Sequence, residues 1–276
     1  MNMRLRYFVV KREPTTYCGL NLVDTPDVDI SVAPVPRAPL GRFAAAIQVF
    51  LCSGVYGSQG LIFGLLMLFG LEYRSDGFIP IKFFAALMLA DTALVVGMMY
   101  VFLKGSGESF REVFLGNRSV KKEAVLGLAL IPVVLIGAGI LVQGLRLVFP
   151  GLHNVKVSPF DEYFSSGWLS AVFLLVVIVA GGVREELQRG FLLHRFDQRL
   201  GGIWVGQVVY SLFFGFLHSI QGWDAAILTG SLGFFWGYLY IKRRSVAAAM
   251  VSHAGFNALQ VIGQIVIKVM GIPVPK

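Results

Sequence analysis

The sequence predicts an all-α protein, a polytopic bundle of transmembrane helices. Of its 276 residues, 56% are hydrophobic and only 14% are charged, which is far from the composition of a soluble globular domain. Apolar stretches long enough to cross a hydrocarbon layer of about 30 Å recur along the whole chain. We count about seven of them, or eight if one is split: 43–71, 79–103, 124–149, 167–193, 203–220, 224–241 and 246–271.

The basic residues indicate how the bundle is oriented. A net charge of +8 could suggest a nucleic acid partner, but lysine and arginine gather in the connections between apolar stretches, so we interpret them as topology signals and expect no nucleic acid. They cluster before the first stretch and after the second, fourth and sixth. The positive-inside rule then predicts a cytoplasmic amino terminus and, with seven spans, an external carboxyl terminus. We expect a multi-pass protein of the cell membrane.

The amino-terminal part of the chain differs in composition from the rest. Residues 1–42 precede the first apolar stretch, and 24–39 within them carries four prolines and no helical period. We therefore expect a flexible cytoplasmic tail, followed by a transmembrane domain over 43–276. The segment RYFVV in this tail is too short for the apolar core of a signal peptide.

Three sets of polar side chains stand inside apolar stretches. A charged side chain at the bilayer centre costs about 2.5–3.5 kcal/mol on insertion scales, so a cluster of them is expected to have a function. The sets are Glu185 with Glu186 and Arg189, then His218, then His253 with Asn257. In the first and third sets, side chains four residues apart share one face of a helix and can point into the bundle.

The three sets are expected at one depth. Gly201 and Gly202 suit a tight turn between the fourth and fifth stretches, and positions 185 and 218 lie equally far from it, at about 25 Å for 1.5 Å per residue. The basic residues after the fourth stretch place Glu185 about 15 Å inside the cytoplasmic boundary. His253 follows the basic turn KRRS by eight residues and lies about 12 Å inside the same boundary. We therefore expect one polar layer, reached from the cytoplasm.

Such a layer contains the groups needed to activate water. A buried carboxylate can take a proton from water while an imidazole orients the same molecule. Histidine and asparagine N–H groups one turn apart can donate to the oxyanion that develops on an attacked carbonyl. Ser219 and Ser252 flank the histidines, but without a spacing that suggests a catalytic triad. The pattern predicts hydrolysis by an activated water, with no covalent nucleophile from the protein.

The three sets of polar residues resemble the motifs of a known family. EELQR at 185–189, FGFLH at 214–218 and HAGFN at 253–257 are similar, in order, to the Glu-Glu…Arg, F-x-x-x-H and H-x-x-x-N motifs of the CPBP family of intramembrane proteases. That family includes the CAAX prenyl endopeptidases and bacteriocin-processing and immunity-type proteins. Any one motif is weak, whereas three in order, each in an apolar helix, are specific. The resemblance covers about 167–271, which we expect to be a protease-like core.

The resemblance implies an intramembrane glutamic endopeptidase without a cofactor or metal. In it, Glu185 is the base that activates water, and His218 assists it. His253 and Asn257 form the oxyanion hole. The residues that would support these groups are Glu186, Arg189 and Phe214. The implied substrate is a membrane-associated peptide or protein, and nothing in these residues indicates whether it is prenylated or otherwise lipid-modified.

Other functions remain open at this stage. A zinc protease could use Glu185, His218 and His253 as ligands with one open position for water, although an HExxH motif is absent from the sequence. A non-catalytic membrane scaffold or regulator could retain the same side chains. A transporter would use buried charges as an ion path, but we detect no inverted repeat in the sequence.

Two further charged residues have no role in the motifs. Asp91 stands inside the second apolar stretch and could be the partner of a buried cation or a residue near water. Arg184 directly precedes Glu185 but is not part of the family pattern. The sequence leaves the roles of both residues open.

Overall fold

The computed structural model describes residues 40–73 and 79–271. They belong to one compact unit, which spans Arg37–Lys276. The tail expected at residues 1–42 lies outside the described residues, except for its last three positions.

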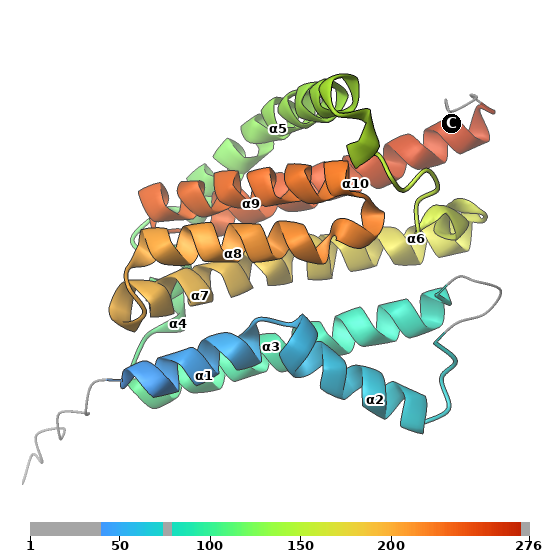
Figure 1. The fold of residues 1–276 in the computed structure, drawn as a ribbon. Helices are drawn as coiled ribbons and strands as arrows, with labels where there is room; N and C mark the ends of the chain where they lie inside the picture. Colours follow the sequence, from blue (N-terminus) through green and yellow to red (C-terminus); the bar gives the residue numbers. More distant parts are fainter. Residues whose placement is uncertain (1–39, 74–78, 272–276) are drawn as a thin grey trace, which may run out of the picture. The chain divides into compact units, whose positions relative to one another are not determined.

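The described residues form helices and connecting loops, and no strand occurs among them (Figure 1). The α-helices are α1 (Arg42–Cys52), α2 (Gly60–Leu68), α3 (Ile81–Ser106), α4 (Phe110–Leu115), α5 (Val120–Val148), α6 (Gly167–Val176), α7 (Glu185–Arg199), α8 (Ile203–Leu217), α9 (Trp223–Arg243) and α10 (Ala247–Val269). Two π-helical segments join helices that follow one another: η1 (Val55–Gln59) and η4 (Val177–Arg184). The prediction of a polytopic helical bundle is thus confirmed.

The number of helices able to cross a membrane is smaller than the seven predicted spans. Each predicted stretch is helical, but by length and composition five described helical segments qualify, or six if α1 and α2, bent by 53°, form one span. The five segments are Ile81–Ser106, Phe110–Val148, Gly167–Arg199, Ile203–Gln221 and Ala247–Val269. The predicted span 224–241 corresponds to α9, which is helical but not among them.

The position of α9 explains this difference. It packs against α5, α8 and α10, so much of its surface meets other helices. Glycines shape these contacts: a Cβ atom on Gly215 of α8 would lie 2.6 Å from the Ala226 carbonyl oxygen and 2.9 Å from the Gly230 Cα. Small residues allow such close approach of two backbones. A helix packed in this way needs less apolar surface than one that faces lipid on most sides, although Phe234 and Tyr238 of α9 are 41% and 43% exposed.

The helices around the predicted motifs are arranged by two further glycine pairs. α6, η4 and α7 run as one long helical segment, and α8 returns beside α7 (Figure 1). The turn uses Gly201 and Gly202, whose φ angles of 100° and 101° favour glycine, as predicted. α10 crosses η4 at Gly181 and Gly182, where a Cβ on Gly182 would lie 2.5 Å from the Ala254 Cβ. Close packing therefore sets α10 directly against the segment that precedes Glu185.

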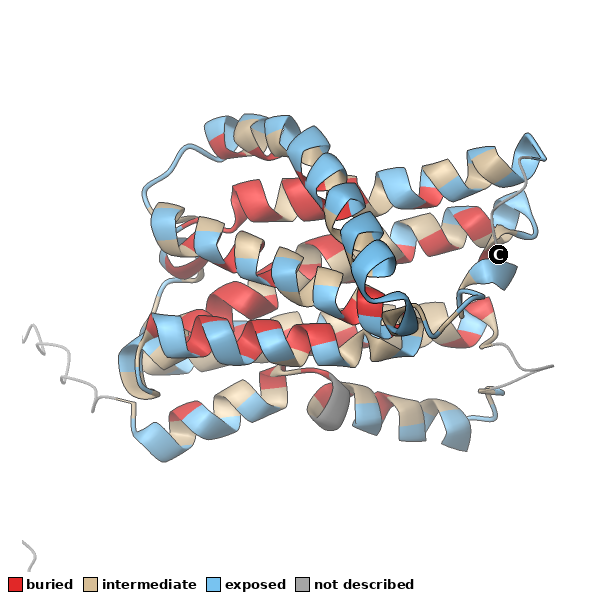
Figure 2. Ribbon diagram, turned by 45° about the horizontal axis from the view of Figure 1, so that its top comes forward, coloured by how far each residue is buried: buried red, intermediate tan, exposed pale blue. Residues whose placement is uncertain are grey.

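The amino-terminal helices pack on the other side of α7. α1 contacts α7 and α3, whereas α2 contacts η1 and α3, and the chain bends between α1 and α2 at Gly54, whose φ is 96°. Exposed residues lie on the outer sides of the helices and buried ones where helices meet (Figure 2). Many of the exposed side chains are large and apolar, such as Leu68, Ile140 and Leu212, as expected for surfaces that face lipid tails.

Candidate active site

The polar site is built around the π-helical segment η4. Its last residue is Arg184, so Glu185 is the first residue of α7. A π-helical turn leaves backbone groups without their usual α-helical partners and often occurs at functional sites. Here the Asn257 side-chain N–H donates to the Val177 carbonyl at 3.3 Å, and a Cβ on Gly181 would lie 2.7 Å from Asn257 Nδ2. α10 thus supports the π-helix from the side.

Glu186 and Arg189 form the fully buried centre of the site. Arg189 Nε donates to Glu186 Oε2 at 3.1 Å and Nη2 donates to Oε1 at 3.2 Å, a two-pronged contact of a guanidinium with a carboxylate. The ion pair is therefore between residues three apart. The sequence places Glu185 and Arg189 on one helix face, but the ion-pair partner of Arg189 in the structure is Glu186.

The rest of the Arg189 guanidinium is also occupied. Nη1 donates to the Gly233 carbonyl of α9 at 3.0 Å, and the group lies over the rings of Tyr210 and Phe214, at 5.0 and 4.7 Å from their centres. Cation–π contacts of this kind are stronger where water is excluded. Phe214, which we expect to support the site, thus contacts Arg189, and its role stays a prediction.

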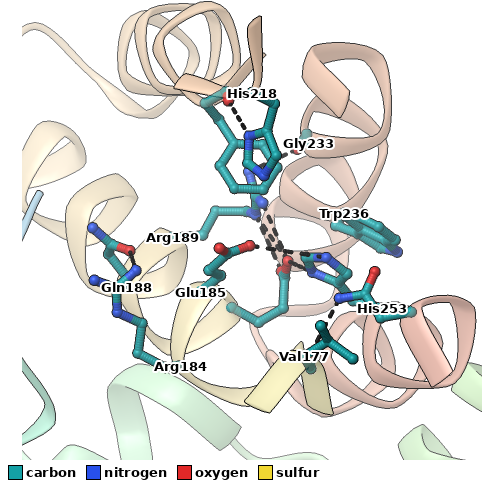
Figure 3. Close-up of polar contacts among 12 residues, drawn as sticks. Val177, Arg184, Glu185, Gln188, Arg189, His218, Gly233, Trp236 and His253 are labelled. Carbon is teal, nitrogen blue, oxygen red and sulfur yellow. Dashed lines mark hydrogen bonds and ion pairs between the residues drawn. The ribbon is translucent and has the colours of Figure 1, made fainter. Parts of the chain in front are cut away.

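His253 joins the two glutamates. Its Nδ1–H donates to Glu186 Oε1 at 2.8 Å, because a carboxylate oxygen can only accept unless it is protonated. Its other nitrogen, Nε2, lies 3.9 Å from Glu185 Oε2. The imidazole stacks on Trp236 of α9, with ring centres 3.7 Å apart and planes 15° apart (Figure 3). The bond and the stack together fix which nitrogen faces Glu185.

Trp236 had no predicted role in the site. The residue is 1% exposed, and its indole Nε1–H donates to Ser252 Oγ at 3.4 Å. One signal in the sequence could have indicated it: tryptophan in membrane proteins is usually found near the interface, whereas Trp236 lies in the middle of a predicted span.

His218 lies at the end of α8 and is linked to the site through Phe214. Its Nδ1–H donates to the Phe214 carbonyl at 2.7 Å, since a carbonyl oxygen is only an acceptor. The two rings meet edge to face, with centres 4.8 Å apart, and Phe214 meets His253 in the same way at 6.3 Å. Nε2 of His218 is therefore the nitrogen that remains for a water or a substrate.

Glu185 differs from Glu186 in its surroundings. Its side chain is 13% exposed, against 1% for Glu186. Figure 3 shows its carboxylate directed toward His253, with Arg189 and His218 on the neighbouring side. Its ion-pair contact with His253, at 3.9 Å, is longer than a hydrogen bond. The structure therefore brings the predicted residues of α7, α8 and α10 into one cluster, in which Glu185 is the accessible carboxylate.

Metal ligation was the alternative reading of the same residues. Within residues 40–73 and 79–271, no group of three or more His, Cys, Asp or Glu side chains is arranged to hold a metal ion. Nδ1 of His253 is directed to a carboxylate and Nδ1 of His218 to a carbonyl.

A second buried polar cluster lies on the opposite face of α7. Arg184 forms an ion pair with Asp91 of α3 and donates from Nη1 to Gln188 Oε1 at 3.0 Å. Gln188 in turn donates to the Cys52 carbonyl of α1 at 2.6 Å. This confirms that Asp91 is the partner of a buried cation, which the sequence left as one of two readings. Gln188 had no predicted role.

The end of α7 carries a third network. Arg195 is fully buried rather than free to face lipid headgroups as expected, and both Arg195 and His194 contact Glu108, between α3 and α4. Burial alone would raise the pKa of the Glu108 carboxyl, but hydrogen bonds with His194 and Arg195 outweigh it and lower the pKa from 4.5 to about 2. This network joins the α3–α4 connection to the helix that carries the site.

Part of the chain is similar to a known protein family. Residues 166–259 match the family model described as type II CAAX prenyl endopeptidase, Rce1-like. The match covers less than half of the chain but contains the three motif segments. No curated protein and no solved structure matches the chain. The match supports a CAAX-type intramembrane endopeptidase in general terms. Residues 166–259, which carry the polar cluster, thus resemble the Rce1-like CAAX endopeptidases, as the three motifs predict.

Proposed function

We propose that this protein hydrolyses a peptide bond of a membrane-associated peptide or protein, using a water molecule activated by Glu185. The observation that carries the proposal is the contrast between the two glutamates. Glu186 is occupied by Arg189 and by His253. Glu185 is the more exposed carboxylate and faces an imidazole nitrogen at 3.9 Å. Glu185 therefore has a carboxylate oxygen that can accept a hydrogen bond from a water molecule.

The proposed reaction has two steps. The Glu185 carboxylate takes a proton from water as the oxygen attacks the scissile carbonyl carbon, and the electrons of the C=O bond move to oxygen. The resulting oxyanion then collapses, the C–N bond breaks, and the leaving amine takes the proton from the Glu185 carboxyl. The products are a free carboxylate and a free amine, and no oxidant, reductant or metal takes part.

The neighbouring side chains have separate parts in this proposal. Nε2 of His218 orients the water, because its Nδ1 is used in the bond to Phe214. The oxyanion is stabilised by Nε2 of His253, in a form protonated on both nitrogens, and by the second amide hydrogen of Asn257, whose first donates to Val177. Glu186 and Arg189 hold His253 and the helix face in place.

The proposed substrate class follows from the setting. A site between helices of a membrane protein suits a peptide that is already held at the bilayer, and the matched family description names CAAX prenyl endopeptidases. We therefore propose a substrate that is cut near a carboxyl-terminal Cys-a-a-X sequence. The distribution of basic residues supports a cytoplasmic amino terminus and a site that is reached from the cytoplasm.

The test uses purified protein in lipid vesicles and quenched fluorescent Cys-a-a-X peptides, farnesylated or not. Glu185→Gln should lower kcat by at least about 10³-fold, because it removes the general base. Glu162→Gln, an exposed acid in the connection before α6, should leave kcat unchanged. Normal cleavage by Glu185→Gln would overturn the proposal and favour a scaffold.

Two further measurements separate the mechanisms. Cleavage that is unchanged by a chelator supports the glutamic reaction, whereas activity lost with chelator and restored by zinc would overturn it in favour of a metalloprotease. Equal kcat/KM for the farnesylated and unmodified peptides would show that the lipid is not recognised, and a large difference would show that it is.

A further inference from the structure

The ion pair of Asp91 and Arg184 contains no motif residue, but Arg184 directly precedes Glu185 in the sequence. Asp91 is fully buried in α3, and Arg184 is 4% exposed. Besides Arg184, two side chains of η1 donate to the Asp91 carboxylate: Ser58 through its hydroxyl and Gln59 through Nε2, the latter at 3.2 Å. One carboxylate therefore holds together α3, the end of η4 and the bend between α1 and α2.

Gln188 extends this cluster to α1. α1 ends at Cys52, so the last carbonyls of that helix lack helical partners. Gln188 Nε2 donates to the Cys52 carbonyl at 2.6 Å while its Oε1 accepts from Arg184. Gly54, with φ 96°, allows the chain to pass over the guanidinium, since a Cβ there would lie 3.0 Å from Arg184 Nη2. Arg184 and Gln188 thus connect α7 to two other segments.

Stability alone is a poor reason for this arrangement. Removing two charges from water costs several kcal/mol per ion, and well-packed apolar side chains often replace a buried ion pair at no loss of stability. A buried pair gives directional contacts instead, because the N–H groups of the planar guanidinium donate hydrogen bonds only along fixed directions. The pair is therefore better suited to setting an orientation than to raising the free energy of unfolding.

The orientation that it sets is the rotation of α7. Successive side chains on a helix point about 100° apart, so fixing Arg184 on one face also fixes where Glu185 points. Figure 3 shows the two side chains on different sides of α7, with Glu185 toward His253 and Arg184 beside Gln188. The π-helical turns of η4 depart from regular α-helical geometry just before Glu185. The contact of Arg184 with Asp91 lies at the end of η4 and can define this rotation.

We propose that Asp91 is a positioning residue for the peptidase site: by binding Arg184, it sets the rotation of α7 that aims Glu185 at the water between α7, α8 and α10. The inference rests on the proposed function. Asp91 and Arg184 touch neither water nor substrate in this scheme and act only through Glu185. A general base that is misplaced by about 1 Å can lose about 10²-fold in rate.

The test measures kcat and KM separately for Asp91→Asn, with the farnesylated quenched peptide as probe. We expect kcat to fall about 10²-fold while KM stays within about threefold, because only the transition state needs the aimed carboxylate. Arg184→Gln should have the same effect, and the double variant should lose no more than either single one, because the two residues act as one unit.

The matched control is Glu123→Gln. Glu123 is also a buried acid, 1% exposed, and it accepts two hydrogen bonds from Arg243 at 2.6 and 2.7 Å, but it joins α5 to α9. This variant should be destabilised in thermal unfolding, though by less because the Arg243 side chain is 31% exposed, and it should keep its kcat. An equal loss of kcat in Glu123→Gln and Asp91→Asn, or a change in KM alone, would overturn the positioning role.

Two further outcomes keep the inference and the proposed function separate. If Glu185→Gln is inactive while Asp91→Asn cleaves normally, the peptidase stands and the positioning role falls. If Glu185→Gln cleaves normally, both fall together. Should Asp91→Asn fail to fold, Ser58→Ala decides: it removes one donor to Asp91 and no charge, and we expect kcat about threefold to tenfold lower, so an unchanged kcat would overturn the role.

Discussion

Buried carboxylates lie on two faces of α7, and they differ in how many hydrogen-bond donors surround them. On the face toward α3, the Asp91 carboxylate is surrounded by donors from Arg184, Ser58 and Gln59. On the face toward α10, Glu186 is equally occupied, but Glu185 next to it has a partly exposed carboxylate. Burying charge in a membrane protein therefore has two outcomes here. Where every carboxylate oxygen has a donor, the charge fixes the geometry of the helices. Where one carboxylate oxygen has no donor among the described residues, as in Glu185, we propose that it acts as a base.

The largest effect that would test this contrast comes from Glu186→Gln. Arg189 would lose its carboxylate inside the bundle, and removing one partner of a buried ion pair costs about 3–5 kcal/mol. Glu185→Gln should change the free energy of unfolding by less than about 1 kcal/mol, because the pair with Arg189 stays intact. Unfolding in detergent measures both variants. Equal destabilisation would show that the two glutamates do not differ in the way described.

A smaller effect is expected where α10 crosses the helix before Glu185. Gly182→Ala would place a Cβ 2.5 Å from that of Ala254, and overpacking of this kind costs about 1–3 kcal/mol. It should also lower kcat, because α10 carries His253. Gly139→Ala on α5 is the control, since nothing lies within 4 Å of its Cβ position, and it should be neutral or slightly stabilising. Thermal unfolding and peptide cleavage would be compared for the two variants.

The stack on His253 should have a still smaller effect on catalysis. Aromatic pairs contribute about 0.5–1.5 kcal/mol beyond buried area, so Trp236→Leu should lower kcat by about threefold to tenfold, and Trp236→Phe by less. Trp204→Leu, a side chain that is 48% exposed on α8, is the control and should retain full kcat. A larger effect of Trp236→Phe than of Trp236→Leu would argue against a role of the ring in holding His253.

The smallest effect concerns the network at the end of α7 and depends on pH. Because the pKa of Glu108 is lowered from 4.5 to about 2 in the folded protein, the carboxylate stabilises the fold above pH 4.5, and this contribution declines as pH falls toward 2. The difference in unfolding temperature between the wild type and Glu108→Gln should therefore be largest at pH 7 and smaller at pH 3. A difference that does not change with pH would contradict the assignment.

The sequence alone determined the class of fold and the three motifs that meet in one cluster. Apolar stretches of about twenty residues must be helical in lipid, where backbone groups have no water to bind, and Gly201 and Gly202 fix the hairpin that brings α7 beside α8. Helical geometry then makes the depth of Glu185 and His218 a matter of counting residues. The helical class and the hairpin turn needed only local rules and are confirmed, whereas the depth of the site in the membrane stays a prediction.

Only the tertiary structure decided which partners the charged residues have. Glu185 and Glu186 are adjacent and chemically identical, and the π-helical turn of η4, together with the crossing of α10, determines which of them Arg189 and His253 bind. The pairing of Arg184 with Asp91 joins residues 93 positions apart. Such contacts depend on helix rotation and on close packing between distant segments, which no spacing along the chain specifies, because a rotation of one helix moves every side chain on it to a different neighbour.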